Sequence, residues 1–223
     1  MAPKIWTEVD EFIDSTLIGR DSLLEATLAA SADEGLPAIA VSPHQGKFLQ
    51  ILARAVGARR ILEVGTLGGY STIWLACALP DGGRLITLEA DAHHAHVARE
   101  NFARAGLDSV IELRFGKAHD TMPEMIAERQ PPFDFIFIDA DKKRIPSYFD
   151  WALQMSRPGT LIVVDNVVRN GALADANSQD EHVIGVRQLH EHIAKDPRVS
   201  ATTLQTVGGK GYDGFTIAIV NSA

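Results

Sequence analysis

The sequence contains a single cysteine, Cys77, among 223 residues, which excludes an internal disulfide. It has no apolar run of membrane-spanning length, and residues 1–10 lack the basic-then-apolar order of a signal peptide. Positive charge is also scarce: 21 Lys and Arg face 29 Asp and Glu, and the net charge of -8 argues against nucleic-acid binding. These absences predict a cytoplasmic protein in which Cys77, within an apolar helical run, is a buried structural thiol.

The composition is that of an ordinary globular protein, with 46% hydrophobic and 22% charged residues. The length suits one α/β domain with a single core, and there is no repeat, low-complexity tract or linker. We therefore expect one domain over residues 1–223, with N-terminal helices in 1–58 and a Rossmann-like core in 59–223.

Hydrophobic periodicity predicts helices first and a βαβ arrangement afterwards. Apolar residues recur at helical spacing from Ile5 to Leu17 and from Leu23 to Ala30, and a third helix is expected at Gly46–Val56. After Arg60, short β-branched runs alternate with helical stretches, as in a parallel sheet. The expected strands are Arg60–Val64, Arg84–Glu89, Val110–Phe115, Phe133–Ile138 and Thr160–Val164. The expected helices between them are Ser71–Leu79, Ala92–Ala105, Ala118–Glu128 and Pro146–Ser156.

The C-terminal part predicts a different strand arrangement. A polar stretch, Asn166 to Glu181, is expected to be a mobile surface loop, and a helix follows it. Strands Ala201–Val207 and Phe215–Val220 flank the Gly-rich turn at 208–211, and so short a connection requires antiparallel pairing. The predicted fold is therefore a Rossmann-like, doubly wound, mostly parallel seven-stranded sheet with a C-terminal antiparallel hairpin.

The segment Ile61–Ser71 is typical of a nucleoside-binding loop. A hydrophobic strand ends in Gly65 and a helix follows, at the sheet edge where α/β proteins bind ligands. Glu89 ends the next strand, where its carboxylate could accept both ribose hydroxyls. Leu67 occupies the place of the second glycine in the dinucleotide fingerprint. With Glu63 available for a cationic amino-acid moiety, the pattern favours S-adenosylmethionine over a dinucleotide; a tight turn without a ligand is the alternative.

Two further strands end in acidic groups at the same sheet edge. Asp139 follows one of them, and Asp165 and Asn166 follow the other. Three hard oxygen donors suit Mg²⁺, whereas a zinc site would call for His or Cys. Alternatively, Asp165 and Asn166 are only turn residues that end a strand.

Taken together, these motifs resemble those of the cation-dependent O-methyltransferases, the family of catechol O-methyltransferase and caffeoyl-CoA O-methyltransferase, and are most similar to its small bacterial members. The resemblance covers about residues 12–220 and rests on Ser42–Lys47, Glu63–Ser71, Asp139–Lys142, Asp165-Asn166 and Gly211–Gly214. It implies the class I S-adenosylmethionine-dependent methyltransferase fold and a homodimer, to which the apolar face from Ile5 to Leu17 could contribute; that face could equally cover the sheet.

The resemblance also implies individual roles. Lys142 matches the general base, and Asp139, Asp165 and Asn166 match the ligands of Mg²⁺ or another divalent cation. The implied cofactor-binding positions are Val41, Glu63, Gly65, Thr66, Ser71, Glu89, Ala118 and Asp139. Tyr212, in the final turn, either lines the acceptor pocket or packs on the surface. Ala140-Asp141 follows the plant and bacterial pattern rather than the mammalian one, so the substrate preference stays open.

The predicted function is methyl transfer from S-adenosylmethionine to a hydroxyl of a small catechol-like substrate, without nucleic-acid or membrane partners. Asp141 is expected to be a helix N-cap, and Lys143, unlike Lys142, a solvated residue. Three alternatives are a nucleotide-dependent oxidoreductase, a non-catalytic S-adenosylmethionine-binding protein, and a methyltransferase acting on nitrogen or carbon. Of these functions, only cation-dependent methyl transfer to a hydroxyl needs both the carboxylates of Asp139 and Asp165 and a base such as Lys142.

Overall fold

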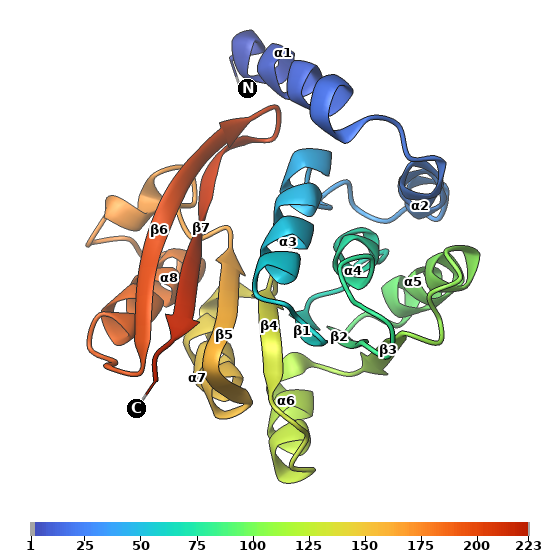
Figure 1. Ribbon diagram of the computed structural model, residues 1–223. Helices are drawn as coiled ribbons and strands as arrows, with labels where there is room; N and C mark the ends of the chain where they lie inside the picture. The colour runs from blue at the N-terminus through green and yellow to red at the C-terminus, as the bar shows by residue number, and fades with distance from the viewer. Residues whose placement is uncertain (1–2, 223) are drawn as a thin grey trace.

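A computed structural model describes residues 3–222, which form a seven-stranded sheet covered by helices on both faces (Figure 1). The strands are β1 (Arg60–Val64), β2 (Arg84–Glu89), β3 (Ile111–Phe115), β4 (Phe133–Ile138), β5 (Ser156–Asp165), β6 (Val199–Gly208) and β7 (Gly211–Val220). The α-helices are α1 (Lys4–Ile13), α2 (Ser22–Asp33), α3 (Pro43–Ala55), α4 (Tyr70–Ala76), α5 (Ala92–Arg104), α6 (Ala118–Ala127), α7 (Ile145–Gln154) and α8 (Glu181–Ile193). Shorter turns are η1 (Asp14–Ile18), η2 (Lys142–Arg144) and η3 (Ala172–Ala174).

The strand order is β3-β2-β1-β4-β5-β7-β6. Strands β1 to β5 are parallel, and β7 runs antiparallel to both of its neighbours, β5 and β6. The predicted fold class is therefore confirmed. Within residues 3–222, no helix combines the length and apolar content needed to cross a membrane.

Alternate residues of each central strand contribute to two separate cores, because successive side chains of a strand point to opposite faces. In β4, Ile136 and Ile138 pack with α6, α7 and α8, whereas Phe135 and Phe137 pack with α3, α4 and α5. Because these strands are buried on both faces, their sequences are continuous runs of apolar residues.

The structure corrects several expected boundaries. Helix α3 starts at Pro43 rather than Gly46, because Ser42 Oγ accepts a hydrogen bond from Gln45 N and proline fits the first helical turn. The final strands extend through the expected turn and leave only Gly209 and Lys210 unpaired. Cys77 is exposed, not buried, since it directly follows the last residue of α4.

Two other segments differ in their burial. In the expected surface loop after Asp165, Val167 and Val168 belong to the core and η3 follows them. In α1 no residue is buried, and Phe12 is 69% exposed, so the apolar face of this helix does not cover the sheet.

Candidate active site

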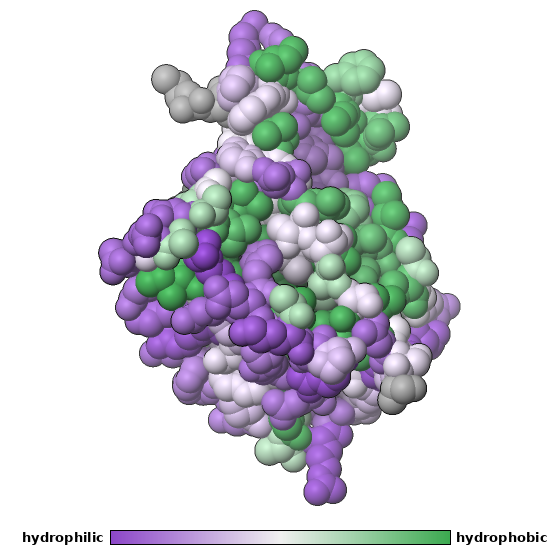
Figure 2. All heavy atoms as spheres, turned by 90° about the vertical axis from the view of Figure 1, so that its left-hand side faces the viewer, coloured by the Kyte–Doolittle hydropathy of each residue, from purple (hydrophilic) through white to green (hydrophobic). Residues whose placement is uncertain are grey.

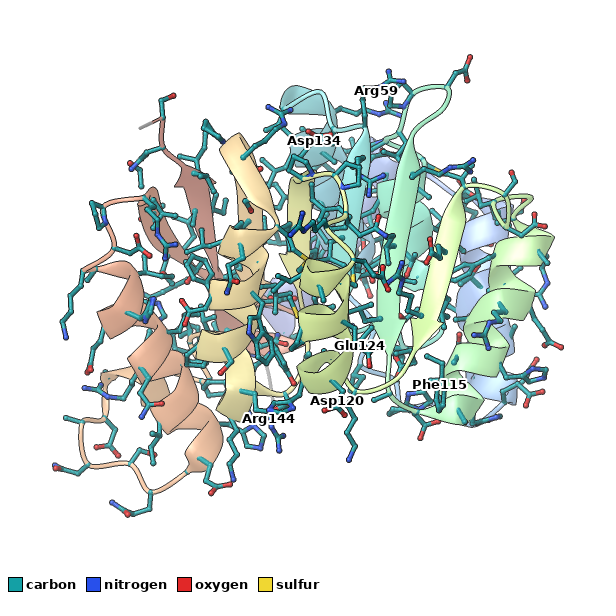
Figure 3. All side chains as sticks on the ribbon, turned by 90° about the horizontal axis from the view of Figure 1, so that it is seen from below. Arg59, Phe115, Asp120, Glu124, Asp134 and Arg144 are labelled. Atoms are coloured by element: carbon teal, nitrogen blue, oxygen red, sulfur yellow. The ribbon has the colours of Figure 1, made fainter. Side chains whose placement is uncertain are left out.

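A cleft of about 1090 Å³ lies along the carboxyl ends of the parallel strands. Figure 3 shows this edge with Phe115, Asp120 and Arg144, opposite Arg59 and Asp134 at the amino ends of the strands. Pockets for a single ligand usually hold about 300–1,000 Å³. The cleft therefore has room for a cofactor and a small acceptor together.

The glycine loop between β1 and α4 forms the floor of this cleft. Gly65 has φ +101°, and a Cβ there would lie 2.0 Å from the carbonyl oxygen of Asp139, so the position requires glycine. Leu67 has φ +52°, a left-handed conformation that is unfavourable for a residue with a branched side chain. Its strain must be held by the surrounding contacts.

Glu89 holds this loop in place. Its Oε2 accepts hydrogen bonds from Thr66 N at 3.2 Å and Leu67 N at 2.7 Å. Its Oε1 accepts from Ala90 N and Asp91 N, both at 2.9 Å. The carboxylate thus joins the ends of β1 and β2 and stabilises the strained loop from the cleft side.

Glu63 lies beneath the loop and is fully buried. Its carboxylate accepts hydrogen bonds from Ser71 Oγ at 2.6 Å, from Thr87 Oγ1 at 2.7 Å, and from the Thr72 hydroxyl. Burial raises the pKa of Glu63 to about 7, and the three hydroxyl donors oppose that shift. Glu63 therefore acts on the cleft through Ser71, which lines it.

The oxygen donors predicted for a cation lie at the carboxyl ends of the neighbouring strands β4 and β5. Asp165 Oδ2 accepts from Gln45 Nε2 at 2.6 Å, and Asp165 Oδ1 accepts from Asn166 N at 2.8 Å. Burial and the negative charge of Asp139 both raise the pKa of Asp165. No three His, Cys, Asp or Glu side chains gather as a metal site within residues 3–222; the donors here are two carboxylates and an amide.

Lys142 and Lys143 are clearly distinguished by their surroundings. Lys142 is 5% exposed, and its Nζ donates to Asp139 Oδ1 at 2.9 Å. Lys143 Nζ instead bonds the exposed Glu181 at 2.8 Å. Asp141 accepts from Arg144 N, which confirms it as an N-cap.

Helix α8 fixes the turn that carries Lys142. A Cβ at Gly185 would lie 2.0 Å from the Lys142 carbonyl oxygen, so only glycine allows the helix to approach so closely.

The comparisons with known proteins agree with this geometry. The sequence model of the family described as O-methyltransferase matches residues 15–219. The chain belongs to the O-methyltransferase family. It is 52% identical to a catechol O-methyltransferase of Niastella koreensis, over 99% of this chain and 100% of that protein. It is 49% identical to a catechol O-methyltransferase of Mycobacterium tuberculosis, over 96% of this chain and 95% of that one.

Solved structures of O-methyltransferases show the same architecture. The Bacillus cereus O-methyltransferase in complex with SAH has a TM-score of 0.96 and 56% identity, covering 98% of this chain and 99% of that one. TomG from Streptomyces achromogenes, in complex with SAM, has a TM-score of 0.95 and 48% identity, with both chains fully covered. The chain is therefore an S-adenosylmethionine-dependent O-methyltransferase, which excludes the oxidoreductase alternative.

Most of the predicted site residues line the cleft of this O-methyltransferase, namely Val41, Gly65, Thr66, Ser71, Glu89, Ala118, Asp139, Lys142 and Asn166. Glu63 and Asp165 lie behind that lining, and Tyr212 is outside it, with its hydroxyl bonded to Gln205. Sequence reasoning missed the contact of Gln45 with Asp165 and the contribution of Arg169 and Lys210 to the cleft. His94, in the first turn of α5, also lines the cleft.

Proposed function

We propose that this O-methyltransferase requires a divalent cation and methylates one hydroxyl of a catechol-like acceptor. The observation that carries the proposal is the buried carboxylate Asp165 beside Asp139, with Lys142 bonded to Asp139. The two relatives named as catechol O-methyltransferases, at 52% and 49% identity, support the same acceptor class.

The residues present fit a hard divalent cation. Asp139, Asp165 and Asn166 offer oxygen donors only, and the repulsion between the two carboxylates would be relieved by a cation bound to both. Gln45 orients Asp165 by its hydrogen bond, as an outer-shell partner orients a ligand. When bound, such a cation would hold two adjacent hydroxyls and stabilise the negative charge on the one to be methylated.

Lys142 is placed to remove the proton of that hydroxyl. Its nearly complete burial and its bond to Asp139 hold Nζ beside the proposed cation ligands. In its neutral form, Lys142 takes the proton at Nζ, and the acceptor oxygen attacks the methyl carbon as S-adenosylhomocysteine leaves. Lys143 is held away from this position by Glu181.

The cofactor-binding residues are proposed to divide between the two ends of S-adenosylmethionine. Glu89 would accept the ribose hydroxyls, on a carboxylate that four backbone N–H groups already orient. Gly65, Thr66, Ser71 and Asp139 would surround the methionine part, on which Glu63 would act through Ser71. Val41 and Ala118 would contact the rest, with Ala118 beside the adenine.

The test is methyl transfer from S-adenosylmethionine to a panel of catechols, measured with Mg²⁺ and with a chelator. We expect methylation that the chelator abolishes and that added Mg²⁺ restores. Lys142→Met should lose turnover but still bind S-adenosylmethionine, whereas the matched change Lys143→Met should keep both. Chelator-resistant methylation would refute the cation requirement, and full turnover by Lys142→Met would remove this lysine from the mechanism.

We further propose that the protein forms a homodimer in which α1 takes part. Figure 2 shows apolar side chains gathered at the top of the molecule, and the exposed apolar residues of this region include Ile5, Val9, Phe12 and Leu17. Such a face is usually covered by a partner. Light scattering should give the mass of a dimer, and Phe12→Asp should lower it; a monomeric mass for the unchanged protein would refute the proposal.

A further inference from the structure

The β6–β7 hairpin extends past the end of β5 and reaches the cleft. Strand β7 pairs with β5 only from Phe215 to Ile219, whereas its pairing with β6 continues to Gly211. The two-residue turn therefore projects beyond the sheet and approaches α1, where Gly209 N donates to Asp10 (Figure 1). This turn carries Lys210, whose side chain lines the cleft.

Asp213, in the same hairpin, fixes the loop that follows Asn166. Its Oδ1 accepts hydrogen bonds from Val168 N at 3.0 Å and Arg169 N at 2.9 Å. Arg169 is thereby held at φ +57°, which is unfavourable for a residue with a Cβ. Hairpin and loop together make one wall of the cleft, and both Arg169 and Lys210 line it.

Most charged side chains near this wall already have partners. Asp213 is bonded to backbone N–H groups, Asp141 accepts from the Tyr148 hydroxyl at 2.5 Å, and Lys143 bonds Glu181. The side chains of Arg169 and Lys210, in contrast, make no hydrogen bond or ion pair with any residue in the described range 3–222. Two cations thus face the cleft without an acidic partner.

The positive charge of Lys210 is also close to Asp139 and Asp165, two of the proposed cation ligands. Burial lowers the pKa of Lys210, while the carboxylates of Asp165 and Asp139 act in the opposite direction. Both carboxylates would be balanced by a bound divalent cation under the proposed function. No negative charge of the described residues then balances Lys210 and Arg169 in the part of the cleft next to the proposed cation ligands, where the acceptor would bind.

We propose that Lys210 and Arg169 form a subsite for an anionic substituent, so that the preferred acceptor is a catechol bearing a carboxylate. This inference rests on the proposed function and narrows its acceptor. A guanidinium can bind a carboxylate through two parallel N–H···O bonds, and an ammonium adds a compact positive charge. Arg169 follows Asn166 closely in the chain and lines the same cleft, and Lys210 lies near Asp165 and Asp139, so the subsite adjoins the position at which the hydroxyls would be held.

The first experiment compares kcat/KM for 3,4-dihydroxybenzoate and for catechol at saturating S-adenosylmethionine and Mg²⁺. We expect the unchanged enzyme to favour the carboxylated acceptor by about tenfold or more, the size expected for a charge-assisted hydrogen bond. Lys210→Gln and Arg169→Gln should each reduce that ratio toward one. Lys117→Gln removes a positive charge that lines the same cleft next to Ala118, and it should leave the ratio at the wild-type value.

A charge reversal and a binding measurement complete the test. Lys210→Glu should shift the preference toward dopamine, whose side chain is cationic. Calorimetric titration of 3,4-dihydroxybenzoate and catechol, with S-adenosylhomocysteine and Mg²⁺ present, should show the same preference in affinity. If catechol is methylated but the carboxylate confers no advantage, or if the substitutions leave the ratio unchanged, the subsite is refuted and the proposed function stands. If neither acceptor is methylated, both fail.

Discussion

Replacing Glu63 with glutamine should flatten the dependence of stability on pH in the cofactor-free protein. The ordinary pKa of this carboxyl is 4.5, and in the folded protein it is raised to about 7 because the group is completely buried. Between these two values the folded protein holds a proton that the unfolded chain releases. The free energy of unfolding therefore falls as the pH rises through that window and levels off above it.

The size of the effect follows from the same two pKa values. A tenfold change in an ionisation constant corresponds to about 1.36 kcal/mol, so ionised Glu63 costs the folded state about 3 kcal/mol. The raised pKa of Asp165 acts in the same direction, so the difference between wild type and Glu63→Gln isolates the contribution of Glu63.

The assay is urea unfolding at pH 5 and at pH 8. Wild type should lose about 2.5 kcal/mol more than Glu63→Gln between these pH values, because part of the window lies below pH 5. Glu124→Gln, which removes an exposed carboxyl of α6 that is labelled in Figure 3, should behave like wild type. Equal losses in wild type and Glu63→Gln would show that Glu63 is already ionised at pH 5, and would refute the burial argument.

Three further substitutions test the packing around the site. Gly185→Ala should destabilise the fold by about 1–3 kcal/mol and lower turnover more than cofactor affinity, because its Cβ meets the Lys142 backbone; unchanged thermal unfolding and kcat would contradict this. Gln45→Leu should weaken Mg²⁺ binding by about 10- to 100-fold in calorimetry, while S-adenosylmethionine still binds; equal Mg²⁺ affinity would remove Gln45 from the site. Gly65→Ala should abolish S-adenosylmethionine binding by equilibrium dialysis, since the position combines φ +101° with a backbone clash; retained affinity would show that the loop can shift.

Much of the fold and of the site can be predicted from the strands in the sequence. The apolar runs of β1, β2 and β4 have the bounds expected from sequence, because strands buried on both faces are strongly marked by composition. Asp139 and Asp165 each follow or end such a run, so the topology alone places them at one edge. The glycine loop was found for the same reason, since strand, glycines and helix are adjacent in sequence.

Other parts of the site depend on contacts that local patterns do not encode. Gln45 and Asp165 are 120 residues apart, and nothing in the sequence around either one indicates the other. The sequence places Lys210 in a Gly-rich turn at 208–211 but does not indicate that cross-strand pairing extends to Gly208 and Gly211 and directs this turn to the cleft. The exposure of α1 cannot be predicted from the sequence either, since an amphipathic pattern shows that one face of a helix is apolar but not what covers that face.

The position of β7 has a consequence for the order in which the protein folds. Strand β6 comes first in the chain, but it joins the sheet only through β7, which lies between β6 and β5. Its backbone therefore gains partners within the sheet only when the hairpin closes, a local event on the microsecond scale. The hairpin that docks on β5 brings Lys210 and Asp213 with it. Docking of the hairpin on β5 therefore completes both the sheet and the wall of the cleft that carries Arg169 and Lys210, and hydrogen exchange in β7, which pairs with β5, should report on this docking.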